Sequence, residues 1–295
     1  MTSFPLVSDR AAYSAIVDRP VWHAPEGARM FVWIIVNVEH WSIERAMPRT
    51  ILSPPMGQPL LPDVPNWAWH EYGMRVGFWR FFDALGERGI KPTLAINGMV
   101  CQSYPRIAEA AHNAGWEFMG HGFVQGPMHK VDDQAKAVAQ TIETITSLTG
   151  SAPMGWESPG LTETAETLDI LSAAGIRYVA DWVLDDQPVW LQARPQPVLS
   201  VPYTVEINDI PMMLFQAQTA EEFHRRGVAQ LDRLWLDSAK QTRVMSISIH
   251  PYIMGVPHRI AQLERLLDAV LAKPEVHLCQ GVEIYQSFAA QHPPN

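Results

Sequence analysis

The stretch Met30-Phe31-Val32-Trp33-Ile34-Ile35-Val36-Asn37-Val38-Glu39-His40 decides the fold. Its first seven residues are all apolar and rich in β-branched and aromatic side chains, which predicts a strand buried on both faces. The polar side chains of Asn37, Glu39 and His40 follow almost at once. A polar side chain beside a buried strand costs free energy unless it is hydrogen-bonded, ion-paired or used in binding or catalysis. We therefore expect these three residues to lie at a functional site.

Short strands alternate with helices along the rest of the chain. Met74, Phe78, Phe81 and Leu85, for example, fall at helical spacing and are followed by Gly89. The strand–helix unit recurs about seven times, which favours parallel strands joined by right-handed crossovers. The polar residues predicted at the strand ends are Asn37, Glu39, Asn97, His121, Glu157, Asp181 and His250.

This order of elements predicts an α/β fold, a distorted (β/α) barrel of about seven strands. The carboxyl ends of barrel strands share one face, where such barrels hold their active sites. A doubly wound open sheet would gather ligands at the same ends. No Gly-x-Gly-x-x-Gly follows the first strand, which argues against a dinucleotide fold. We expect an N-terminal extension over residues 1–27 and a single domain over residues 28–295.

A long segment, residues 41–71, shows no sustained periodicity and carries six prolines. Loops of this length in a compact domain are usually functional or make contacts between subunits. The alternative is a rigid surface loop, because prolines restrict the backbone but do not indicate which residues the segment contacts. The sequence leaves both open.

Composition limits the partners of the protein. The 295 residues carry a net charge of −9, from 22 basic and 31 acidic residues, and no block of Lys or Arg stands out. Nucleic acid and membrane surfaces are therefore not expected as partners. The N-terminus lacks the basic and apolar regions of a secretory signal, and two cysteines are too few for a disulfide framework. We expect a cytoplasmic protein.

The polar residues at the strand ends resemble those of the polysaccharide deacetylase (NodB-homology) family over roughly residues 28–285. In metal-dependent members, the first strand ends with an Asp base and an Asp ligand. A His-x-x-x-His segment supplies two further ligands, and a late His acts as general acid. The matching positions here are Asn37, Glu39, His121, Gln125 and His250. The first, second and fourth depart from the pattern. An amide cannot act as a base, and Gln125 is a weaker zinc ligand than imidazole.

A narrower resemblance is to PuuE-type allantoinases and related cyclic-imide hydrolases. It rests on Asn37-Val38-Glu39, the motif Glu-Tyr-Gly-x-Arg-x-Gly-x-Trp-Arg at residues 71–80, Asp185-Asp186-Gln187-Pro188, and Val201-Pro202-Tyr203-Thr204 followed by Asn208-Asp209. Members of this branch open small cyclic amides and imides, and the allantoinase type is thought to work without a metal. The resemblance implies a small-molecule substrate and a homotetramer.

Three residues are the predicted catalytic groups: Glu39, His121 and His250. The alternative for Glu39 is a buried carboxylate held by an arginine such as Arg75. Glycines on both sides of His121 would let a ligand approach closely, although a core histidine bonded to a carbonyl is the alternative. His250 has a near-neutral intrinsic pKa, which suits proton transfer.

Further residues are predicted to contact the substrate: Asn37, His40, Gln125, Trp156, Glu157 and Asp185. The expected cofactor is either none or a single divalent metal, with zinc preferred. The candidate ligands for such a metal are Glu39 and His121, and three good ligands plus water would be usual for catalytic zinc.

These observations predict a hydrolase that opens a C–N bond of a small cyclic amide, imide or ureide. Glu39 would activate water directly, or hold a metal that does so, and His121 would orient the water or bind the metal. His250 would stabilise the oxyanion and protonate the leaving nitrogen. The alternatives are a metal-dependent N-deacetylase of a cytoplasmic amino sugar and, third, a catalytically silent ligand-binding homologue.

Overall fold

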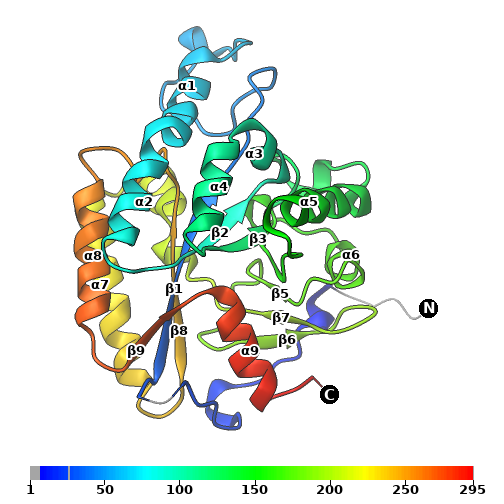
Figure 1. Cartoon of the computed structure of the whole chain (residues 1–295), viewed down its shortest axis with the longest axis vertical. Coiled ribbons are helices and arrows are strands. Elements are labelled where there is room, and N and C mark those ends of the chain that lie inside the picture. The colour runs from blue at the N-terminus through cyan, green and yellow to red at the C-terminus, as the bar shows by residue number, and fades with distance from the viewer. Residues whose placement is uncertain (1–6, 26, 295) are drawn as a thin grey trace.

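A computed structural model describes residues 7–25 and 27–294 (Figure 1). Residues 1–6 and 26 of the expected N-terminal extension lie outside the described residues. The described part of the extension packs on the rest of the chain. The Trp22 ring stacks on Phe31 with 5.1 Å between ring centroids. Arg10 forms a 2.7 Å ion pair with Asp169.

Nine strands form one curled sheet in the described part of the chain, which confirms the α/β fold. Their order is β6-β7-β5-β4-β3-β2-β1-β8, with β9 also paired to β1. All neighbours are parallel except β6 and β7, which form an antiparallel hairpin. The strands are β1 Met30–Val38, β2 Thr93–Ile96, β3 Glu117–Gly120, β4 Gly155–Trp156, β5 Tyr178–Val179, β6 Val189–Leu191, β7 Val198–Ser200, β8 Arg243–Ile249 and β9 Val276–Cys279.

The sheet curls into a half-barrel rather than a barrel closed by strand pairing. The strand order ends in β6 and β8, and residues 204–208, which follow β7 in the chain, lie against β8. The backbone N–H of Thr204 donates to Ser246 Oγ at 2.6 Å, and that of Ser246 donates to Thr204 Oγ1 at 3.0 Å. A single bridge joins Asn208 to Ser248. This segment brings residues 203–209 beside the end of β8.

Strand β1 lies between β2 and β8, and all nine of its residues are buried. This burial explains its unbroken apolar run, because both faces of the strand meet apolar side chains. In the register, Val36 lies opposite Ile249 of β8, and Val38 lies opposite Ile96 of β2. The residues that follow these strands therefore emerge together at one edge of the sheet.

Nine α-helices flank the sheet in the described residues, and none is long and apolar enough to cross a membrane. Helices α7 and α8 pack side by side (Figure 1). The four apolar residues predicted for the face of α2 and the turn before it are all buried. The helices are α1 Val64–Tyr72, α2 Phe78–Gly86, α3 Gly98–Ser103, α4 Pro105–Asn113, α5 Gln134–Thr149, α6 Thr167–Ala173, α7 Ala220–Asp237, α8 Ile260–Ala272 and α9 Gly281–Gln291.

The irregular segment ends earlier than the sequence pattern indicates, because α1 already begins at Val64. The Asp63 carboxylate accepts the backbone N–H of Asn66, and Pro65 occupies the first turn. Both features are typical of a helix start. With the loop before it, α1 projects from the body of the molecule at the top of Figure 1.

Candidate active site

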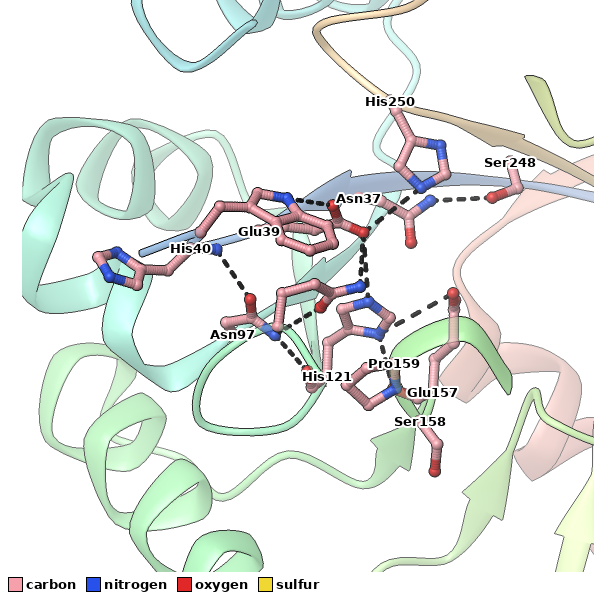
Figure 2. A network of polar contacts seen from close by, with 12 residues as sticks. Asn37, Glu39, His40, Asn97, His121, Glu157, Ser158, Pro159, Ser248 and His250 are labelled. Atoms are coloured by element: carbon pink, nitrogen blue, oxygen red, sulfur yellow. Dashed lines mark hydrogen bonds and ion pairs between the residues drawn. The ribbon is translucent and has the colours of Figure 1, made fainter. Parts of the chain in front are cut away.

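The carboxyl ends of β1, β3 and β8 bring Glu39, His121 and His250 together (Figure 2). All three residues are buried, with at most 3% of their surface exposed. His121 Nε2 and His250 Nε2 each lie 3.7 Å from Glu39 Oε1. Two imidazoles therefore face one carboxylate oxygen from different strands.

These groups line a cavity of about 140 Å3. Its walls combine polar groups from the strand ends with aromatic and apolar side chains from the loops. The lining residues are Glu39, Trp41, Arg49, His121, Gln125, Glu157, Gly160, Leu161, Tyr203, Val205, Asn208, Ile210, Pro211, Phe215 and His250. Buried titratable groups that converge on a cavity are typical of a catalytic site.

Glu39 is held as a carboxylate by the donors around it. Its Oε2 accepts from Trp41 Nε1 and its Oε1 from Gln125 Nε2, both at 2.8 Å. Burial alone would raise the pKa of Glu39. The neighbouring imidazoles of His121 and His250 outweigh burial and lower this pKa from 4.5 to about 2. Glu39 is therefore charged at any neutral pH, and it is a weak base.

One ring nitrogen of His121 forms a hydrogen bond, and the other forms none within the described part of the chain. Its Nδ1 lies 2.7 Å from the backbone carbonyl of Glu157, so Nδ1 carries the proton that this bond requires. Its Nε2 faces Glu39 and has no hydrogen-bond partner among the described residues. Burial lowers the pKa of His121, but Glu39 and Glu157 raise it above the ordinary 6.5 overall. In the neutral ring, Nε2 offers a lone pair to the cavity.

His250 is oriented by Asp209, which the sequence analysis did not name as a site residue. Asp209 Oδ1 accepts from His250 Nδ1 at 2.6 Å, and Oδ2 accepts the backbone N–H of His250 at 2.8 Å. Burial lowers the pKa of His250, while Asp209 and Glu39 raise it above the ordinary value overall. The Asn208-Asp209 pair of the sequence motif was the available signal for this contact.

Two predicted substrate-binding amides, Asn37 and Gln125, lie beside this group. Asn37 Nδ2 donates to Ser248 Oγ at 2.9 Å, whereas its buried Oδ1 has no partner among the described residues. Gln125 Oε1 accepts from Asn97 Nδ2 at 3.1 Å. That bond turns the amide nitrogen of Gln125 towards Glu39.

Glu157 lies on the other side of His121 from Glu39. Its Oε1 is 3.9 Å from His121 Nδ1, and its buried Oε2 has no hydrogen-bond partner in the described chain. Burial raises the pKa of Glu157, despite the opposing charges of His121 and His250. The site thus holds two buried carboxyl groups with opposite pKa shifts.

Four predicted substrate contacts do not line this cavity, namely Asn37, His40, Trp156 and Asp185. The His40 side chain points away from Glu39 (Figure 2), and its ring lies 6.2 Å from that of Tyr104. The Trp156 ring is fully buried in the core, where its Nε1 donates to Ser158 Oγ. Asp185 forms a 2.6 Å ion pair with Arg19 and lines a separate cavity of about 530 Å3.

The structure adds site residues that the sequence gave little reason to choose. His70 comes from α1, and its Nε2 lies 4.0 Å from Glu39 Oε2. Burial lowers the pKa of His70 to about 3, so the ring is neutral. Arg49 and Phe215 reach the cavity from irregular or distorted segments. No strand end or motif marked these residues.

The residues present do not fit a divalent metal centre. Glu39 and His121, the two candidate metal ligands, lie 3.7 Å apart, but the described residues include no group of three His, Cys, Asp or Glu that could hold an ion. Both Glu39 oxygens accept N–H groups, and Gln125 presents its amide nitrogen rather than its oxygen. N–H donors complement an anion, whereas zinc needs lone pairs from about four ligands.

Comparisons with known proteins show which sequences and folds the chain resembles. Residues 69–179 match the model of the polysaccharide deacetylase family. A Schizosaccharomyces pombe protein that carries the name polysaccharide deacetylase is 25% identical over 243 residues, which cover 76% of each chain.

Solved structures extend the likeness to almost the whole chain. The crystal structure of PuuE allantoinase is 25% identical, with a TM-score of 0.84 over 94% of this chain and 96% of that one. A probable polysaccharide deacetylase from Pseudomonas aeruginosa PAO1 is 27% identical, with a TM-score of 0.82 over the same shares. The family match over residues 69–179 and these structures show that the chain resembles the polysaccharide deacetylase family, with PuuE allantoinase among its structural neighbours, and they support a hydrolase that acts on C–N bonds.

Proposed function

We propose that this protein hydrolyses a ring C–N bond of a small cyclic amide, imide or ureide. The observation that carries the proposal is the pair of imidazole Nε2 atoms, each 3.7 Å from one buried carboxylate oxygen, in a cavity of only about 140 Å3. Pockets for drug-sized ligands start at about 300 Å3, so a small substrate is favoured over a polymer. The likeness to PuuE allantoinase supports the same class.

In this mechanism, His121 is the general base. Its Nε2 lone pair is free, and its pKa is raised from the ordinary 6.5 by Glu39 and Glu157 against the effect of burial, close to the range that suits proton transfer. Glu39, with a pKa of about 2, is the weaker base, and instead stabilises the positive charge that forms on His121. His121 takes one proton from water as the oxygen attacks the ring carbonyl carbon.

His250 is the general acid. With Asp209 on Nδ1, its protonated ring presents an Nε2–H towards the cavity. This N–H donates to the oxyanion of the tetrahedral intermediate and then passes its proton to the ring nitrogen as the C–N bond breaks. The products are a carboxyl group and an amine or amide nitrogen, which remain in one molecule.

The two amides would hold the substrate and position Glu39. The unpartnered Oδ1 of Asn37, which lies beside the cavity rather than in its lining, would accept an N–H of a ring held against His250, because a cyclic imide or ureide presents such a donor next to its carbonyl. Gln125 is already bonded to Glu39 and Asn97, so we assign it to positioning Glu39. We derive no step through a metal, because the donors around Glu39 match an anion.

The second candidate is N-deacetylation of an amino sugar, which the names of several relatives favour. It breaks the same kind of bond, but it releases acetate as a separate molecule. The small cavity and the poor fit to a metal both disfavour it.

One experiment separates the candidates. Purified protein is incubated with a panel of cyclic ureides and imides and, in parallel, with N-acetylglucosamine and its oligomers, with and without added zinc. The proposal expects ring opening of at least one cyclic compound without dependence on zinc. Acetate release alone would replace it with the deacetylase, and binding without turnover would identify a silent homologue.

A further inference from the structure

We propose that Arg49 binds a carboxylate of the substrate, so that the preferred substrate is an anionic cyclic amide. This inference rests on the proposed function and names its substrate class. Arg49 lies on the loop before α1 and lines the same cavity as Glu39 and His250. Its guanidinium carbon lies 5.1 Å from the centroid of the Phe215 ring, another lining residue.

Among the described arginines that bury a nitrogen without a hydrogen-bond partner, Arg49 is the one that forms no ion pair. Within the described ranges, no Asp or Glu forms an ion pair with it, and its buried Nε has no hydrogen-bond acceptor. Arg19 and Arg29 also have a nitrogen without a hydrogen-bond partner, but each forms an ion pair, with Asp185 and Glu275. A buried donor without an acceptor lowers stability, which a ligand with a matching anion would offset.

The carboxylates of the site are engaged elsewhere. Glu39 accepts from Trp41 and Gln125, and Asp209 holds His250. Glu157 lies against His121. None of these three carboxyl groups forms an ion pair with Arg49. A carboxylate is the planar anion that fits the guanidinium fork with two parallel hydrogen bonds.

The position of Arg49 sets where this carboxylate lies. Phe215 is 67% exposed, so the pair of Arg49 and Phe215 forms the rim of the cavity. His121 and His250 are almost fully buried and form its floor. A substrate would place its ring amide against the histidines and a charged substituent against Arg49.

A matched pair of ligands tests this assignment. Hydantoin-5-acetic acid and hydantoin-5-acetamide share a ring and differ in one negative charge. For wild-type protein we expect kcat/KM for ring opening, and affinity by calorimetry, to favour the acid by about 10- to 100-fold, as expected for a charge-assisted pair. Arg49→Gln should lose this preference, and Arg49→Lys should retain part of it.

Arg45→Gln is the control, because Arg45 lies on the same loop, is exposed and does not line the cavity. It removes the same charge and should keep the wild-type preference. Equal affinity of wild type for acid and amide, a preference that persists in Arg49→Gln, or no binding of either compound would overturn the inference.

The two measurements keep this test separate from that of the function. Ring opening of both compounds at equal rates would leave the function standing and remove the role of Arg49. Binding of the acid through Arg49 without ring opening of any panel compound would support the role of Arg49 and contradict the proposed function.

Discussion

At the scale of single residues, the site is organised by the contrast between Glu39 and Glu157. Both are buried carboxyl groups, and burial raises the pKa of each. Glu39 also accepts two N–H groups and faces two imidazoles, which lowers its pKa to about 2. Glu157 lacks such donors, and its pKa remains raised. Neighbours, rather than depth of burial, decide which carboxyl group carries charge.

The raised pKa values of His121 and His250 lead to a prediction about pH. Burial lowers both pKa values. For His121, Glu39 and Glu157 raise the pKa above 6.5 overall, and for His250, Asp209 and Glu39 do the same. His121 must lose its proton to act, so activity rises with pH through its pKa. His250 must keep its proton, so activity falls as pH rises further. We expect a bell-shaped profile of kcat/KM on the alkaline side of pH 6.5.

Asp209→Asn tests which limb belongs to His250. The variant keeps the shape of Asp209 but removes the charge that raises the pKa of His250. We expect kcat to fall by about 100-fold or more and the alkaline limb to move to lower pH. Asp232→Asn, which removes a surface partner of Lys273, is the control and should match wild type. An unchanged alkaline limb in Asp209→Asn would contradict the role of His250 as the acid.

The sequence could predict the site residues that directly follow a strand, but few of the other site residues. Glu39, His121 and His250 follow apolar strands, so their meeting follows from parallel pairing alone. His40 was wrongly predicted to contact the substrate. Successive residues of an extended chain point to opposite sides, and the prediction did not take this alternation into account. Asn37 and Glu39 share one side, and His40 faces the other. His70 and Arg49 come from a helix and a loop, whose tertiary positions have no local signal.

At the scale of elements, the contact between β3 and β4 positions His121. Gly120 ends β3, directly before His121, and lies opposite Trp156 of β4. A Cβ at Gly120 would come within 2.5 Å of Trp156 Cε3. The large ring thus requires glycine here, and the close approach of the two strands sets the level at which His121 emerges.

Gly120→Ala should therefore affect both stability and activity. Overpacking of this kind typically costs about 1–3 kcal/mol, so we expect a lower Tm and a fall in kcat/KM as His121 shifts. Gly86→Ala is the matched control, because nothing lies within 4 Å of its added Cβ. A Gly120→Ala protein with the Tm and activity of wild type would show that the strands move apart without consequence for the site.

The sequence predicted the elements whose position is set by burial of apolar residues. It missed the helix whose start is set by capping residues. The long apolar run of β1 and the periodic face of α2 are both buried as expected. Helix α1 was predicted as loop, because Trp67 and Trp69 lie only two residues apart among the polar residues Asn66, His70 and Glu71 and so give no clear apolar face. Its start depends on Asp63 and Pro65, a signal that the six prolines of the segment obscured.

At the scale of the whole molecule, the fold class followed from the recurrence of strand and helix. The open side of the half-barrel could not be predicted, because residues 204–208 contact β8 there through side-chain hydrogen bonds that have no periodic signature. The expected cytoplasmic location, the homotetramer and the division at residue 28 stay predictions. The homotetramer concerns contacts between chains, which one chain's pattern does not encode.

The stability of the molecule should depend on Glu39 in acid. Its pKa falls from 4.5 to about 2 on folding, so it stabilises the folded state above about pH 4.5 and loses this effect as pH falls towards 2. We expect the difference in unfolding free energy between wild type and Glu39→Gln to shrink over this range. Denaturant titrations of both proteins at several pH values measure it. A difference that is constant from pH 6 to pH 3 would contradict the assigned charge of Glu39.

The central claim is that the Glu39–His121–His250 group opens a ring by adding water across a C–N bond. Mass spectrometry of a turnover in water labelled with heavy oxygen tests it most directly. We predict one product, heavier than its cyclic substrate by a single molecule of labelled water, formed by wild type and at least about 100-fold more slowly by His250→Asn. Labelled acetate released as a second product, or full turnover by His250→Asn, would contradict it.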